Sequence, residues 1–232
     1  WPRDWRQVFH IGVTGLLVQA TYLGGVFMAI HLGLAAGVTA LVVGLQPLLT
    51  AVGAGWLLGE RVSRTQWLGL ALGFIGVALV IAGKSAEEGT DMPQIGTMLL
   101  PALVALIGIT LGTLYQKRYC PGFDLRTGSV IQFVPSLIIT AAIASQTETM
   151  HIDWSGEFVF ALLWLVIVLS LGAISLLNLL IRSGSAVNVA SLFYLTPPTT
   201  ALLAWFLFGE TLTGIAFVGM AVAVAGVWLA RK

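Results

Sequence analysis

Residues 45–61 read LQPLLTAVGAGWLLGER, and residues 195–211 read LTPPTTALLAWFLFGET. Both stretches carry a proline at the third position and a Gly-Glu pair near the end. When residues 36–79 are laid on residues 186–229 without gaps, 15 of 44 positions are identical. Apolar composition does not explain this agreement, because the proline and the Gly-Glu pair are shared as well. The chain therefore contains an internal repeat.

The composition around the repeat is that of a membrane protein. Of the 232 residues, 58% are hydrophobic and 9% are charged, against roughly 25% charged in a soluble domain. A soluble enzyme is thereby excluded. The net charge of +1 offers no basic excess for a nucleic acid. The single cysteine, Cys120, can form neither an internal disulfide nor a multi-thiol metal site.

The apolar runs predict the number of membrane spans. A bilayer core about 30 Å thick needs roughly 20 apolar residues per helix. Eight such runs lie between the charged segments, which predicts an all-α integral membrane protein. The predicted spans are 8–30, 35–58, 65–83, 95–116, 127–146, 158–181, 186–208 and 212–230.

The basic residues predict the orientation in the membrane. Ten of the eleven lysines and arginines fall on one side of an eight-span topology, and Lys84 alone falls on the other. The positive-inside rule then places both chain ends, and so the C-terminus, in the cytoplasm. We expect a multi-pass protein of the cell membrane, which is the inner membrane if the source is bacterial.

The spacing of the repeat predicts an inverted arrangement. Five spans separate each helix from its mate, so the two copies cross the membrane in opposite directions. The second copy, residues 95–232, has five predicted helices. Residues 1–84 hold only the mates of its last three, and residues 85–94 form an external loop. We therefore expect the eight visible helices to belong to a ten-helix (5+5) bundle whose first two helices precede Trp1.

The two quoted stretches also resemble a known family. Together with Gly69, Gly73 and Gly76 after the first stretch, and Gly219 and Gly226 after the second, they are similar to the EamA-type branch of the drug/metabolite transporter superfamily. The resemblance implies two inverted five-helix repeats around a central cavity, cytoplasmic termini and movement of small metabolites, often outward. Set against that pattern, the first two helices are not seen in residues 1–232, and we expect them before Trp1.

The two prolines suggest where a solute would bind. Alternating-access transporters bind substrate near the bilayer midplane, where helices break at matched positions of two halves. Pro47 and Pro197 lie midway along their spans, and each follows a hydrogen-bonding residue, Gln46 or Thr196. The alternative is a packing kink satisfied by a neighbouring helix. On a continuous helix, Thr39, Gln46 and Thr50 would form one polar stripe.

Further polar and aromatic residues within the spans are candidates for the same cavity. Buried amides are costly in hydrocarbon, so they should face the bundle interior or a wet cavity. For Gln132 and Asn178 we favour helix–helix hydrogen bonding, and for Gln19, one turn from Tyr22, a cavity role. Aromatic packing is the commoner use of the remaining three candidates. These are Tyr115, Trp164 and Tyr194.

The glycine series predicts close helix contacts. Gly69, Gly73, Gly76 and Gly83 recur on one helix face, and Gly219, Ala223 and Gly226 repeat them in the second copy. Small residues at this spacing let helices approach closely, and we expect the contact within one chain more than between two chains. Glu60 and Glu210 follow a glycine and precede a helix, where an acidic residue favours the helix N-terminus. We expect capping there and no catalysis.

The function predicted from these features is a secondary transporter, an exporter of small, amino-acid-like metabolites that works by alternating access. A non-transporting membrane scaffold or partner subunit is the alternative. An intramembrane enzyme is the least favoured, since Ser183 lies at a span end without a histidine. We expect no catalytic residue, cofactor or metal. The expected partners are a metabolite and the lipid bilayer, with no nucleic acid, and a homodimer is left open.

Overall fold

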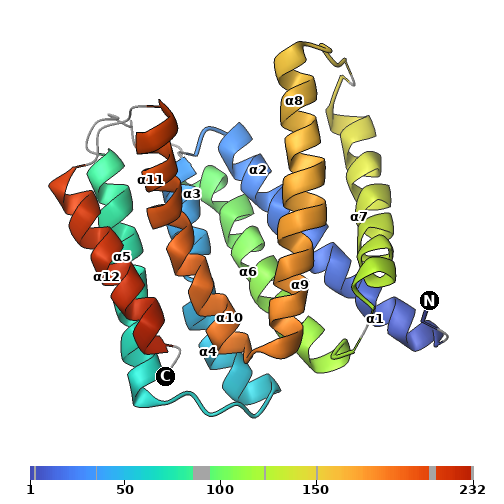
Figure 1. Ribbon diagram of the computed structural model, residues 1–232. Coiled ribbons are helices and arrows are strands. Elements are labelled where there is room, and N and C mark those ends of the chain that lie inside the picture. Colours follow the sequence, from blue (N-terminus) through green and yellow to red (C-terminus); the bar gives the residue numbers. More distant parts are fainter. Residues whose placement is uncertain are drawn as a thin grey trace.

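A computed structural model describes residues 1–2, 4–34, 36–85, 95–122, 124–149, 151–208 and 213–230. Helices run through the described part as a bundle, and both termini lie toward the same end of it (Figure 1). The first repeat copy contains α1 (Trp5–Gly15), η1 (Leu16–Leu23), α2 (Gly24–His31), α3 (Ala36–Val43), α4 (Gln46–Leu57) and α5 (Arg64–Ser85). The second contains α6 (Ile95–Tyr119), α7 (Leu125–Thr147), α8 (Gly156–Trp164), η2 (Leu165–Ala173), α9 (Ile174–Ser183), α10 (Ala186–Ser191), η3 (Leu192–Leu195), α11 (Thr196–Phe208) and α12 (Gly214–Ala230).

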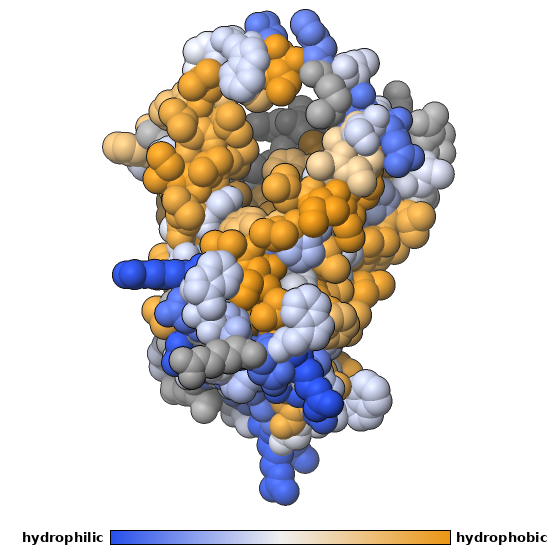
Figure 2. Space-filling model, turned by 90° about the vertical axis from the view of Figure 1, so that its right-hand side faces the viewer, coloured by the Kyte–Doolittle hydropathy of each residue, from blue (hydrophilic) through white to orange (hydrophobic). Residues whose placement is uncertain are grey.

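These elements join into the predicted spans. Within the described ranges, five helical stretches are long and apolar enough to cross a bilayer: residues 5–31, 38–57, 97–119, 126–147 and 156–183. Three shorter apolar helices cover residues 64–80, 186–195 and 214–230. On the face shown in Figure 2, apolar side chains cover much of the upper and middle part, and hydrophilic side chains gather at the top and over the lower part. The helical membrane fold and its approximate span count agree with the sequence prediction.

The structural repeat begins before residues 36 and 186, where the gap-free sequence alignment starts. The first span of the first copy contains a π-helical segment, η1, at residues 16–23. The matching span of the second copy contains η2, also π-helical, at residues 165–173. The offset of about 150 residues that relates the prolines also relates these segments. Because π-helical turns are rare in proteins, their presence in both copies supports the duplication.

Helices α5 and α12, which are mates in the repeat, pack against each other along their glycines. A Cβ atom added to Gly69 would lie 2.3 Å from the nitrogen of Ala230, and one added to Gly76 would lie 2.3 Å from the nitrogen of Ala223. In the reverse direction, a Cβ on Gly226 would lie 2.3 Å from the nitrogen of Gly73. The order of these contacts makes the two helices antiparallel, as an inverted repeat requires. The contact within one chain is confirmed for Gly69, Gly73 and Gly76, whereas the surroundings of Gly83 lie outside what the structure describes.

The end of α4 shows how the Gly-Glu pair works. Gly59 has a φ of 68°, a left-handed conformation that favours glycine after a helix. The next amide, of Glu60, donates to the carbonyl of Ala54 at 3.1 Å. The Glu60 carboxylate accepts from the amide of Ala186 at 3.2 Å. Capping is thus confirmed, but the capped helix is α10 of the other copy and not the helix that follows Glu60. Glu210 lies outside the described residues.

Candidate functional site

In both copies the helix that carries the predicted proline is broken near it. In the first copy α3 ends at Val43, Gly44 and Leu45 form a turn, and α4 begins at Gln46 with Pro47 in its first turn. Proline has no N–H to donate and clashes with a preceding helical turn, which favours a break before Pro47. Proline alone does not force one, since α6 and α7 continue through Pro101 and Pro135. In the second copy a 3₁₀ segment, η3, occupies the equivalent place before α11. The matched helix breaks are confirmed.

A cavity of about 180 Å³ lies at these breaks. Three of its lining residues carry hydroxyl groups, Tyr22, Thr39 and Thr196, and no lining residue is charged. The lining comes from η1, α2, α3 and α5 of the first copy and from η3 and α11 of the second. The full lining is Tyr22, Val26, Ile30, Thr39, Ala40, Val43, Gly44, Val77, Phe193 and Thr196. The cavity therefore lies between the copies and joins an apolar wall to a few polar groups.

The three residues of the predicted polar stripe lie on both sides of the first break. Thr39 lies on α3 and lines the cavity, whereas Gln46 and Thr50 lie on α4 beyond the turn. The Gln46 carboxamide nitrogen donates to the Thr50 hydroxyl at 3.1 Å, and both side chains are buried. All three side chains are buried, and the two-residue turn at Gly44 and Leu45 separates the first from the other two. A solute-facing polar stripe made of these residues remains a prediction.

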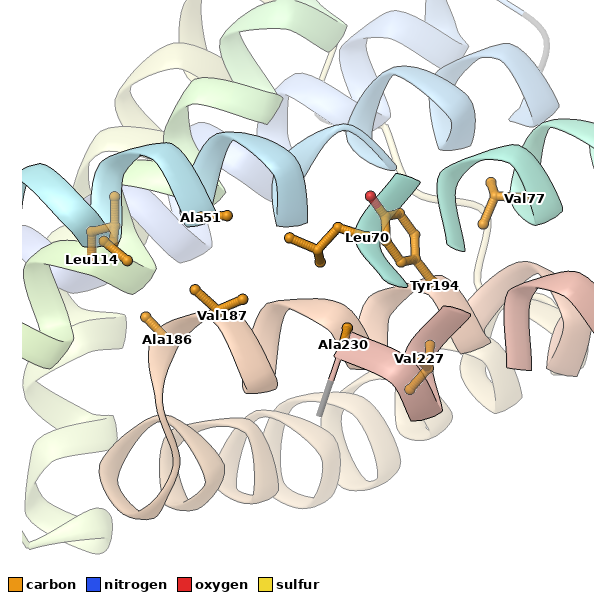
Figure 3. Close-up of a cluster of buried hydrophobic side chains, with 10 residues drawn as sticks. Ala51, Leu70, Val77, Leu114, Ala186, Val187, Tyr194, Val227 and Ala230 are labelled. Carbon is orange, nitrogen blue, oxygen red and sulfur yellow. The ribbon is translucent and has the colours of Figure 1, made fainter. Parts of the chain in front are cut away.

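Tyr194 is a core residue in this structure. Its side chain has 0% exposure and belongs to a cluster with Leu70, Val77 and Val227. Figure 3 shows the ring lying between Leu70 and Val77 of α5. The hydroxyl oxygen has no hydrogen-bond partner among the described residues. Aromatic packing, the commoner alternative from the sequence, is what the structure shows.

Gln19 has both carboxamide atoms buried and without a partner among the described residues. It lies on η1, one turn before Tyr22. The cavity lining includes Tyr22 and does not include Gln19. Pro47 is buried at the start of α4, and the side chain of Pro197 lies outside the described residues. The proposed roles of Gln19, Pro47 and Pro197 toward a solute remain predictions.

Gln132 and Asn178 belong to a separate chain of amides. The Gln116 nitrogen donates to the Asn178 oxygen at 2.9 Å, and the Asn178 nitrogen donates to the Gln132 oxygen at 3.2 Å. The three residues join α6, α9 and α7, and all are buried. This is the helix-joining role favoured for Gln132 and Asn178. Gln116 was missed because it directly precedes Lys117 and Arg118, which suggested a span end.

Tyr115 and Trp164 lie away from the cavity lining. The Tyr115 hydroxyl is 2.6 Å from His10 Nδ1, and the His10 ring stacks on Tyr119 at 5.0 Å between centroids. This contact joins α1 of the first copy to α6 of the second. His10 had no role in the prediction, since a lone histidine near a span end carries no sequence signal of its partner. Trp164 is 57% exposed at the end of α8.

The fold and the paired breaks define a class, the multi-pass helical membrane protein with a cavity between two repeat copies. Comparison with known sequences then identifies the family. The pattern of the EamA-like transporter family matches residues 1–82 and 96–231. The chain belongs to this family of membrane transporters.

Individual relatives agree with this assignment. The chain is 28% identical over 226 residues to the "Uncharacterized inner membrane transporter YedA" of Escherichia coli (strain K12), covering 97% of this chain and 71% of that protein. It is 30% identical over 198 residues to the "Uncharacterized transporter YvbV" of Bacillus subtilis (strain 168), covering 84% of this chain and 63% of that protein. It is 26% identical to the "Probable amino-acid metabolite efflux pump" of Salmonella typhimurium (strain LT2), covering 93% of this chain and 74% of that protein.

A solved structure supports the fold. It superposes with a TM-score of 0.77 at 19% sequence identity, and the match covers 98% of this chain and 76% of that one. At this level of identity the likeness bears on the fold alone. The resemblance stated from the sequence motifs is confirmed by the family match, and the chain is a multi-pass membrane protein.

Proposed function

We propose that this chain exports small, amino-acid-like metabolites by alternating access, and that the cavity at the paired helix breaks holds the solute. The observation that carries the proposal is that one cavity is lined by the break of each copy. In a transporter built from inverted repeats, a site between the copies is reached from opposite sides when one copy rocks against the other.

The size and lining of the cavity support a small solute without a net charge. The volume of about 180 Å³ is below the roughly 300–1,000 Å³ of pockets for drug-sized ligands. Apolar groups from Val26, Val43 and Phe193 would pack on the solute, and the hydroxyls of Tyr22 and Thr196 could bind its polar atoms. A solute with a net charge would find no opposite charge in the lining, whereas the carboxylate and ammonium of a zwitterionic amino acid partly offset each other. The name of the Salmonella relative supports an amino-acid-like solute.

The direct test is counterflow in proteoliposomes that contain the full-length protein. A panel of labelled neutral amino acids is offered against an internal pool of the same compound. We expect saturable exchange of at least one compound. If none is exchanged, the transporter proposal fails and the membrane scaffold becomes the better description.

Two conservative changes locate the site. Thr196→Val and Tyr22→Phe each remove one hydroxyl from the lining and preserve most of the shape. We expect each to raise the half-saturating concentration about 5–10-fold, because one hydrogen bond contributes about 1 kcal/mol. The matched controls are Thr113→Val, whose hydroxyl bonds the Ile109 carbonyl of its own helix at 2.8 Å, and Tyr194→Phe. Equal effects of site and control changes would contradict this position of the site.

A further inference from the structure

The two copies differ at one position of the helix break. The offset of 150 residues that aligns Pro47 with Pro197 also aligns Gly44 with Tyr194. One copy therefore has no side chain at this place, and the other has a large aromatic ring. The flanking positions are more alike in character, since Val43 corresponds to Phe193 and both line the cavity.

In the second copy the ring of Tyr194 fills the space beside the helix break. Tyr194 has 0% exposure, and it lies over Gly73 of α5. A Cβ atom on Gly73 would come within 2.3 Å of Tyr194 Cδ2, so the ring sits directly against the backbone of that helix. Figure 3 shows the same ring between the side chains of Leu70 and Val77. The space beside this break is thus filled from within the chain.

In the first copy the equivalent space is left open. Gly44 lines the cavity, and a Cβ atom added there would meet Val77 Cγ1 at 3.6 Å and its own helix's carbonyls, Ala40 at 3.0 Å and Leu41 at 3.1 Å. Val77 lines the same cavity. Among the described glycines only Gly33 and Gly59 have a positive φ, so the backbone conformation of Gly44 does not exclude a side chain, although a Cβ atom would press on the two carbonyls. Any side chain at position 44 would take its volume from the cavity.

We propose that Gly44 sets the largest solute that the cavity accepts, and that Tyr194 plugs the equivalent space in the second copy. This inference rests on the proposed transport function and adds its size selectivity. The asymmetry leaves the chain with one solute site, displaced toward the first copy, although the fold is built from a repeat. The residue type at position 44 then selects among neutral solutes of different bulk.

The test is a graded series at position 44. Gly44→Ala, Gly44→Val and Gly44→Phe are reconstituted, and counterflow is measured for glycine, alanine, valine, leucine and phenylalanine. As the residue at position 44 becomes larger, we expect the largest amino acid that the protein transports to become smaller. The largest solute that the parent carries should lose tenfold or more in transport efficiency at Gly44→Val, while the smallest one should stay within threefold of the parent.

Gly24 provides the matched control. It lies in the same copy, and a Cβ atom there would meet nothing within 4 Å. The same three substitutions at Gly24 should leave the size profile unchanged. Thermal stabilisation of the protein by each solute gives a second readout. Gly44→Ala adds a single carbon, so it tests the proposal even if the larger variants fail to fold.

The outcomes separate the two proposals. A parent protein that exchanges none of the compounds overturns the transport function, and with it this inference. A parent that exchanges them, with a Gly44 series that lowers all solutes equally or leaves the profile unchanged, overturns the size selection alone. Loss that follows solute bulk at position 44, and not at position 24, supports it.

Discussion

The contact between α5 and α12, which we call the seam, and the two helix breaks come from the same duplication. The two copies keep the same kind of residue along the seam but not at the breaks. Along the seam both copies keep small residues, so that Gly69 and Gly76 have Gly219 and Gly226 as mates. At the breaks the copies diverge, with Gly44 opposite Tyr194 in the alignment. Helices that pack on their own mates need small residues in both copies. Helices that contact different neighbours are free to change one copy at a time.

The largest expected effect comes from filling the seam. Gly76→Val would place its Cβ within 2.3 Å of the Ala223 backbone, where no flexible side chain can move aside. We expect a loss of folded protein equivalent to more than about 3 kcal/mol, measured as the yield and thermal midpoint of the monodisperse detergent-solubilised protein. Gly226→Val should cost a similar amount, because it meets the equivalent backbone of α5.

Gly24→Val is the control for both changes, since its Cβ meets no neighbour. It should fold like the parent. A Gly76 variant as stable as the Gly24 variant would show that the two helices do not meet as described. A large difference between Gly76→Val and Gly226→Val would show that the seam is less symmetric than its sequence.

The next largest effect on stability is expected at Tyr194, whose ring fills the space beside the break in the second copy. Tyr194→Ala should cost about 3–5 kcal/mol of stability, as for other large aromatic residues removed from a core. Tyr194→Phe should keep or slightly raise the thermal midpoint, because the buried hydroxyl has no partner to lose. If Tyr194→Phe destabilises as much as Tyr194→Ala, the hydroxyl has a hydrogen-bond partner and the ring is more than a plug.

A smaller effect is expected at the amide chain of the second copy. Asn178→Leu removes both hydrogen bonds and leaves groups of Gln116 and Gln132 unpaired. We expect a loss of about 1–2 kcal/mol in thermal unfolding. Gln19→Leu is the comparison, since the Gln19 amide bonds to none of the described residues, and its stability should not fall. An Asn178 variant as stable as the parent would contradict a structural role for the amide chain.

The smallest effect lies far from both regions, at the start of α7. The Asp124 carboxylate accepts from the amides of Thr127 and Arg126, each at 3.0 Å, and these hydrogen bonds lower its pKa below the ordinary value of 3.8. The contribution to stability is therefore present above that value and is lost as the pH falls through the lowered pKa. Asp124→Asn keeps a capping side chain without titrating, so unfolding of this variant should depend less on pH below about 4. An identical pH dependence in both proteins would count against this cap.

Much of the architecture follows from local sequence. The lengths of the apolar runs predicted the membrane spans. In the bilayer core the backbone N–H and C=O groups must be hydrogen-bonded within the segment, which an α-helix achieves. The matched prolines of the repeat predicted both helix breaks, because proline cannot donate the helical hydrogen bond. The match between the copies mattered, since α6 and α7 run on through Pro101 and Pro135. The repeated glycines predicted a close contact because a missing side chain permits one. Each prediction concerns a property that a residue has in its own helix.

The tertiary structure decided which helix meets which. It paired α5 with α12, carried the Glu60 carboxylate to the first turn of α10, and joined His10 to Tyr115 across 105 positions of the chain. It also brought Tyr22, Thr39 and Thr196 to the lining of one cavity, and it kept Gln132 and Asn178 in a separate hydrogen-bond network with Gln116. Such contacts depend on the packing of several helices at once, and no single segment of the sequence contains that information.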